Sequence, residues 1–224
     1  MKNLLIILCC ITQVSLGQSK TTQIQANGWY PQVKELTEVF NLKNLTTSTE
    51  AFHFRFWTEI QVVDIWTTNN KTFQGKLIYY TRESNEGRTV QDTIERIHSH
   101  IATIDTGTAR QIYQFVNKQQ LFTIPTADSI KGWSYGFDGT AYLVEYSTPS
   151  IYSFKDYWLP EVQPLEEAKV VVNVLHYLQQ TLNMNNDWYT YVKSLPRGCY
   201  KGQSLELICN QKNLPQYKNG KPVE

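Results

Sequence analysis

Two regions in which apolar and polar residues alternate limit the fold most strongly. The segment 52–57 alternates phenylalanines with polar residues, the period of a strand with two different faces. The alternation changes parity between Val62 and Val63, which predicts one long strand with a bulge at that point. Asn69-Asn70 is typical of a turn, and the segment 73–80 then predicts the return strand of a hairpin.

The second alternating region, 133–158, predicts a hairpin or a meander. Tyr142 and Val144 alternate with Leu143 and Glu145, and residues typical of a turn follow at 147–150. Residues 89–104 fit either a helix or a further strand. Their threonines and isoleucines are β-branched, which favours the strand.

Helical periodicity appears in four places. The longest apolar stripe runs from Pro164 to Leu182, and a shorter one covers 106–118 after a capping residue at Asp105 or Thr106. Short helices are predicted around 33–40 and 188–192. We therefore expect an α+β fold, an antiparallel sheet from 51–104 and 133–158 whose one face is covered by the helices 106–118 and 164–182.

The N-terminus predicts export. Lys2 precedes an apolar run from Leu4 to Ile11, and small residues follow at Ser15 and Gly17, as in a cleavable signal peptide. A lipoprotein anchor at the cysteines of this run is the alternative, but it expects a small residue where Leu8 stands. The predicted organisation is a signal peptide at 1–17, one α+β domain at 18–209 and a loose polar tail at 210–224, with no transmembrane segment.

Export also decides how the cysteines are interpreted. Outside the predicted signal, the sequence contains only Cys199 and Cys209, and such a pair in an oxidising compartment predicts a disulfide. A metal site is the alternative, although no further cysteine or histidine lies near the pair in sequence.

The charge balance argues against nucleic acid as a partner. The chain has 21 Lys and Arg against 20 Asp and Glu, and removing the signal with Lys2 leaves 20 of each. A neutral domain without a basic run lacks the electrostatic footprint of nucleic-acid binding. The sequence has no nucleotide-binding loop, zinc-protease motif or nucleophile elbow, so no cofactor is predicted.

Asp138 and Glu145 are the candidate catalytic residues. Carboxylates on neighbouring strands can serve as the acid and base of a small secreted hydrolase. The alternative is structural, because an Asp-Gly pair at 138–139 is ordinary turn chemistry and Glu145 could form an ion pair with Lys155 or Arg110.

His98 and His100 are the candidate metal ligands. On a strand their side chains would point in the same direction, as a His-x-His site requires. The sequence supplies no third ligand at a metal-site spacing, so two solvent-facing histidines are the competing interpretation.

Aromatic residues concentrate in the 133–158 region and suggest a ligand surface. Exposed rings can stack a sugar or contact a protein, whereas buried rings would fill the core below the long helix. The candidate ligand-binding residues are Trp133, Tyr135, Tyr142, Tyr157 and Trp158.

One pattern in this region resembles a known group of sequences. Trp133-x2-Gly136-x-Asp138-Gly139-x2-Tyr142-x-Val144-Glu145, followed by Tyr157-Trp158-x-Pro160, is similar to a pattern in uncharacterised secreted bacterial proteins. The resemblance implies a periplasmic, envelope or extracellular location and carries no activity. We expect a non-catalytic exported protein that binds a protein or a carbohydrate, with the hydrolase as the alternative.

Overall fold

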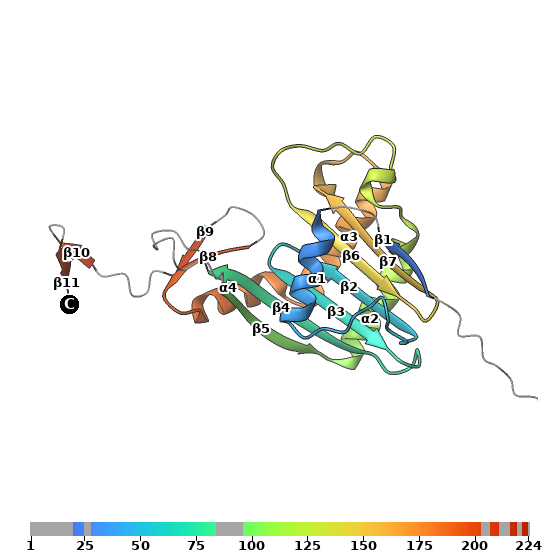
Figure 1. Cartoon of the computed structure of the whole chain (residues 1–224), viewed down its shortest axis with the longest axis horizontal. Helices are drawn as coiled ribbons and strands as arrows, with labels where there is room; N and C mark the ends of the chain where they lie inside the picture. The colour runs from blue at the N-terminus through green and yellow to red at the C-terminus, as the bar shows by residue number, and fades with distance from the viewer. Residues whose placement is uncertain are drawn as a thin grey trace, which may run out of the picture.

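The computed structural model describes residues 20–24, 28–83, 96–202, 207–210, 216–218 and 221–223. The helices in these residues are α1 (Trp29–Val39), α2 (Thr106–Lys118), α3 (Glu166–Thr181) and α4 (Met184–Ser194). The strands are β1 (Thr21–Ile24), β2 (Phe52–Trp57), β3 (Gln61–Thr67), β4 (Gln74–Glu83), β5 (Ile97–Ile104), β6 (Ala141–Ser147), β7 (Ile151–Trp158), β8 (Gly198–Lys201), β9 (Leu207–Asn210), β10 (Gln216–Lys218) and β11 (Lys221–Val223). The expected α+β class is confirmed (Figure 1).

One sheet organises the fold. Its order is β1-β7-β6-β2-β3-β4-β8-β9, and β5 also pairs with β4; every pairing is antiparallel except that of β1 with β7. The centre is formed by β2, which pairs with β3 on one side and with β6 on the other. Residues almost a hundred positions apart therefore lie side by side in the middle of the sheet.

Both faces of the sheet are covered by helices. On one face, phenylalanines of β2 pack with buried residues of α2, α3 and α4 in the larger core, as the sequence predicts for the first two of these segments. On the other face α1 packs through Val33 and Leu36 against Trp57 and Leu143 in a second core. Figure 1 shows α1 crossing the sheet on the side opposite α2 and α3.

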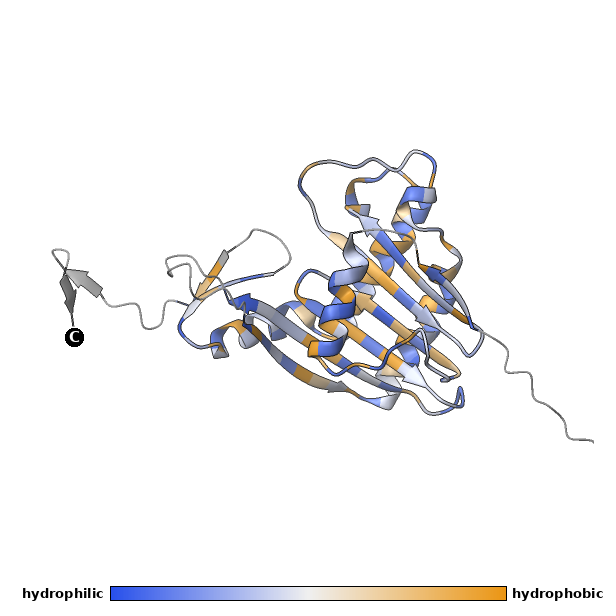
Figure 2. Ribbon diagram, in the orientation of Figure 1, coloured by the Kyte–Doolittle hydropathy of each residue, from blue (hydrophilic) through white to orange (hydrophobic). Residues whose placement is uncertain are grey.

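Local sequence explains where the helices begin and which side they bury. The Asp105 carboxylate accepts hydrogen bonds from the backbone N–H groups of Gly107 and Thr108, so of the two expected capping residues it is Asp105 that caps α2. The buried side of α3 includes Ala168, Val171 and Leu178, which belong to the predicted stripe. Figure 2 shows the alternation of hydrophilic and hydrophobic residues along the strands that these helices cover.

The single long strand predicted around Val62–Val63 is wrong. The chain turns at 58–60, and β2 and β3 form an antiparallel hairpin in which Trp57 pairs with Val62. The apolar residues change parity there because the chain turns. The alternation of inward and outward side chains starts again in the returning strand. The turn is held by Thr58, whose backbone N–H donates to Gln61 O and whose hydroxyl accepts from Gln61 N.

Other expected elements have mixed outcomes. Of the segment 89–104, residues 97–104 form the expected strand, β5, and residues 89–95 lie outside the described residues. The expected hairpin is formed by β6 and β7. Within the predicted loose tail, β10 and β11 pair as a short ribbon. The proposed signal peptide, 1–17, lies outside the described residues.

The C-terminal strands carry the predicted disulfide. Cys199 on β8 and Cys209 on β9 stand opposite each other and are bonded. This bridge joins two short strands at the far end of the sheet, where β8 pairs with β4 at Arg82 and Glu83. Among the described residues, no helix has the length and apolar character that a membrane crossing requires.

Candidate functional site

The sheet face below α1 contains a row of buried charges. Alternation in β2 places His53 and Arg55 on this face, opposite to the phenylalanines. The register then aligns Arg55 with Asp64 on β3 and with Glu145 on β6. One guanidinium is therefore flanked by carboxylates from both neighbouring strands. The segment 40–50 covers this row and contributes Glu50.

His53 bridges two carboxylates and is almost fully buried, with 2% exposure. Its Nδ1 lies 2.5 Å from Glu50 Oε2, and its Nε2 lies 2.6 Å from Asp64 Oδ1. Two acceptors require two N–H donors, so the ring is an imidazolium. Burial by itself lowers the pKa of His53, but the hydrogen bonds and charges of Asp64 and Glu50 outweigh it and raise that pKa.

Arg55 is fully buried and uses only part of its hydrogen-bonding capacity. Its Nε donates to Asp64 Oδ1 at 2.8 Å, and its Nη2 donates to the carbonyl of Lys43 at 2.7 Å. Nη1 lies 3.6 Å from Glu145 Oε2 and has no hydrogen-bond partner among the described residues. Because buried polar groups are nearly always paired, this donor marks a position where a further acceptor belongs.

Glu145 is held in place by two donors from its surroundings. Its Oε2 accepts from Trp57 Nε1 and its Oε1 accepts from the Tyr152 hydroxyl, each at 2.8 Å. Burial and the charge of Glu145 raise the pKa of Tyr152, which keeps its proton for this bond. The predicted ion pairs of Glu145 with Lys155 or Arg110 do not form. Those two cations instead donate to backbone carbonyls elsewhere.

The network contains as many cations as carboxylates, although one cation lies at its exposed edge. Its carboxylates are Glu50, Asp64 and Glu145, its buried cations are His53 and Arg55, and its third cation is Lys43, whose side chain is 49% exposed. Burial acts to raise the pKa of Glu50, but hydrogen bonds from His53 and Lys43 lower it to about 2. For Asp64 the charge of Arg55 likewise outweighs burial and lowers the pKa. Glu50 and Asp64 are therefore held in the ionised form beside His53 and Arg55.

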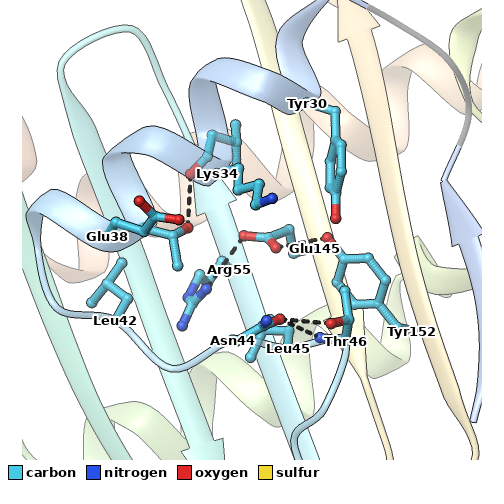
Figure 3. A pocket seen from close by; sticks show the side chains of 12 residues that line it. Tyr30, Lys34, Glu38, Leu42, Asn44, Leu45, Thr46, Arg55, Glu145 and Tyr152 are labelled. Atoms are coloured by element: carbon cyan, nitrogen blue, oxygen red, sulfur yellow. Dashed lines mark hydrogen bonds and ion pairs between the residues drawn. The ribbon is translucent and has the colours of Figure 1, made fainter.

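A cavity of about 230 Å³ lies between α1 and these charges. Figure 3 shows its floor, made by Arg55, Glu145 and Tyr152, and the Lys34 side chain extending from α1 above it. Glu38 and Asn44 also border it, and its apolar lining includes Val33, Leu42 and Leu45. A concave site with an apolar lining and a few fixed polar groups is typical of small-molecule binding.

The two predicted catalytic carboxylates lie in different surroundings. Asp138 is exposed in a bend that precedes β6. Glu145, in contrast, is buried within that strand and borders the cavity with Arg55 and Tyr152. The hydrolase hypothesis needs both carboxylates at one site, whereas Asp138 is exposed and does not line the cavity that Glu145 borders.

The two histidines proposed as metal ligands both lie on β5. His98 Nε2 is 3.5 Å from Glu83 Oε2, while the exposed His100 ring stacks near Tyr79 and Tyr191. Within the part of the chain that the structure describes, no group of three or more His, Cys, Asp or Glu side chains is arranged to hold a metal ion.

Most of the proposed aromatic ligand surface belongs to the core. Trp133 and Tyr157 are buried, and Tyr142 packs against Phe56 beneath the helices. Tyr135 is 51% exposed and stacks on Trp158 with the ring centroids 5.9 Å apart. A stacking surface in this region is thus limited to the Tyr135–Trp158 pair and its neighbours.

Sequence reasoning missed Arg55 on the cavity floor and the two residues, His53 and Asp64, that belong to its charge network. His53, Arg55 and Asp64 alternate with apolar residues in two consecutive segments. This alternation is the sequence feature from which these residues could have been identified. Treating those segments as one strand concealed that a hairpin would bring Arg55 opposite Asp64.

Comparison with known proteins gives no family for this chain. No protein-family model matches the sequence, and no curated protein matches it either. The fold and the site define it as an α+β domain with a network of mostly buried charges beneath a small cavity.

Proposed function

We propose that this chain is an exported, non-catalytic binding protein that holds a small molecule in the cavity between α1 and the sheet. The observation that carries the proposal is the buried Nη1 of Arg55, which borders the cavity without a hydrogen-bond partner among the described residues. A ligand acceptor at this position would complete the hydrogen bonding of the guanidinium.

The protonation of the network supports binding over catalysis. A general acid or base works best when its pKa lies near the working pH. Here the pKa values of Glu50 and Asp64 are lowered and those of His53 and Arg55 are raised, so the network keeps these four groups charged. Fixed charges orient a polar ligand without exchanging protons with it.

Export is part of the same proposal. The N-terminal pattern of Lys2 followed by an apolar run supports it, and so does the Cys199–Cys209 bridge, because disulfides persist in oxidising compartments. The resemblance to secreted bacterial sequences agrees with that location. N-terminal sequencing of the protein from its own host tests it, since a chain that still begins with Met1 would contradict export.

Native mass spectrometry tests the binding. The protein purified from its own host should show a mass excess that disappears on denaturation. Thr37→Trp places a large ring on the cavity side of α1 and should abolish the excess, whereas Val39→Trp lies on the same helix at a position that is 51% exposed. Retention of the excess by the Thr37 variant would show that the ligand binds elsewhere, and a bare polypeptide in the native spectrum would count against a resident ligand.

A further inference from the structure

The cavity floor presents two opposite charges close together. Arg55 Nη1 and Glu145 Oε2 are 3.6 Å apart, and both side chains border the cavity. Arg55 Nη1 offers its unpaired N–H groups, and each Glu145 oxygen accepts one hydrogen bond, from Trp57 or from Tyr152, and keeps a further lone pair. The cavity floor can therefore bind a hydrogen-bond acceptor of a ligand through Arg55 and a hydrogen-bond donor of the same ligand through Glu145.

The charge balance limits which ligand fits. The network contains three carboxylates and three cations, of which only Lys43 is exposed, so a ligand with a net charge would disturb this balance in a region of low dielectric. The rim repeats this balance with one cation, Lys34, and one anion, Glu38. A ligand that carries one charge of each sign preserves neutrality and matches both floor and rim.

We infer that the cavity binds a small zwitterion, an α-amino acid with an apolar side chain, whose carboxylate contacts Arg55 and Lys34 and whose ammonium contacts Glu145. This inference rests on the proposed binding function and names the chemical class of its ligand. The short separation of the two floor charges selects a ligand whose charged groups are attached to the same carbon.

Lys34 is available for this role. It lies on α1 at an exposed position, and it makes no ion pair within the described residues. Figure 3 shows its ammonium extending toward the side of the cavity that holds Glu145 and Tyr30. A carboxylate between Lys34 and Arg55 would receive two cationic donors, which is the strong form of hydrogen bond.

The volume and the apolar lining of the cavity indicate the size of the ligand and the kind of side chain that it carries. A volume of about 230 Å³ is below the usual range for drug-sized ligands and suits a single small molecule. Val33 and Leu45 are almost fully buried, and both line the cavity beside Leu42. This apolar wall fits an aliphatic side chain, so L-leucine and L-valine are suitable probes.

Isothermal titration calorimetry with matched ligands tests the inference. L-leucine should bind, while leucinamide lacks the carboxylate and N-acetyl-leucine lacks the ammonium. Each of these two analogues should bind at least ~10-fold more weakly, because each leaves one floor charge without its partner. If either analogue bound as tightly as L-leucine, the inference that the ligand is a zwitterion would be wrong.

Two lysine variants test whether Lys34 contacts the ligand carboxylate. Lys34→Met should weaken leucine binding at least ~10-fold, since it removes one carboxylate donor at an exposed site. Lys169→Met is the control, because Lys169 is exposed on α3 and pairs only with the neighbouring Glu166 on the surface. Unchanged affinity in Lys34→Met would overturn the assignment of the carboxylate.

The two proposals fail in distinguishable ways. If no amino acid binds but the protein from its host carries another ligand that Thr37→Trp removes, the zwitterion is wrong and the binding cavity stands. If leucine binds equally well to Thr37→Trp, the cavity itself is not the site and both proposals fail.

Discussion

Arg55 and Asp64 face each other across the β2–β3 hairpin, with Arg55 Nε donating to Asp64 Oδ1 at 2.8 Å. Asp64 Oδ1 also lies within hydrogen-bond distance of His53 Nε2, so one carboxylate oxygen serves two cations. The pair thereby joins the imidazolium of His53 to the guanidinium that forms the cavity floor. Several consequences of this arrangement can be measured.

Breaking the pair should be costly, and the two positions should be coupled. Arg55→Met or Asp64→Leu alone should lower the free energy of unfolding by about 3–5 kcal/mol, because each leaves a buried charge unpaired. The double variant should cost less than the sum of the two. Urea unfolding of all four proteins gives the coupling energy. The surface pair Lys169–Glu166 is the control, with coupling of about 0–1 kcal/mol, and additive effects at Arg55 and Asp64 would contradict the network.

The imidazolium of His53 should make stability fall at alkaline pH. The folded-state pKa is raised above the ordinary 6.5, so the contribution is fully present below pH 6.5 and is lost as the pH rises through the folded-state value. His53→Gln should remove this pH dependence and lower the free energy of unfolding at pH 6. Urea unfolding at several pH values above 6 measures both. If the unfolding free energy of His53→Gln depends on pH as steeply as that of the wild type, another group causes the dependence.

Glu50 should contribute to the loss of stability in acid. Its pKa falls from 4.5 to about 2 on folding, so its contribution is present above pH 4.5 and disappears as the pH drops toward 2. Glu50→Gln should flatten the fall in unfolding free energy across that window. Glu166→Gln, on the exposed side of α3, should leave the acid profile unchanged. Identical acid profiles for Glu50→Gln and wild type would show that Glu50 is not the group responsible.

The Cys199–Cys209 bridge should stabilise the C-terminal strands. It closes a short loop, with a sequence separation of 10, for which the chain-entropy relation gives about 2–3 kcal/mol. Cys199→Ser should lower the thermal midpoint, and the wild-type mass should rise by about two units on reduction. An unchanged midpoint would mean that the bridge is absent or does not contribute.

Gly75 should tolerate no side chain. A Cβ at this position in β4 would lie 2.8 Å from Ile65 Cγ2 and 3.0 Å from Ile104 Cβ on the neighbouring strands. Gly75→Ala should therefore cost about 1–3 kcal/mol through overpacking. Gly28→Ala is the matched control because nothing lies within 4 Å of its added Cβ. Equal stability of the two variants in urea would show that the strands can move apart.

Part of the fold follows from local pattern. The stripe on α3, the Asp105 cap on α2 and the alternation in β6 are all set by neighbours in sequence, and all were predicted. The disulfide was also predictable, because Cys199 and Cys209 are the only cysteines after the apolar N-terminal segment.

The site could not be predicted in the same way. Glu145 was identified as a candidate, but its contacts with Trp57 and Arg55 depend on β6 pairing with β2. Strand pairing is long-range, and alternation along one strand does not specify its neighbour. The burial of His53 has the same cause, since the ring lies between Asp64 of the paired strand β3 and Glu50 of the covering segment.

The sequence by itself determined the class of fold, most of its elements and the cysteine bridge, because periodicity, capping and residue count are local properties of the chain. The tertiary structure decided which charges meet. Only when β2 lies between β3 and β6, with α1 above them, do these carboxylates and cations form one network with a cavity beside it. That selection arises from long-range pairing and from the cost of burying an unpaired charge.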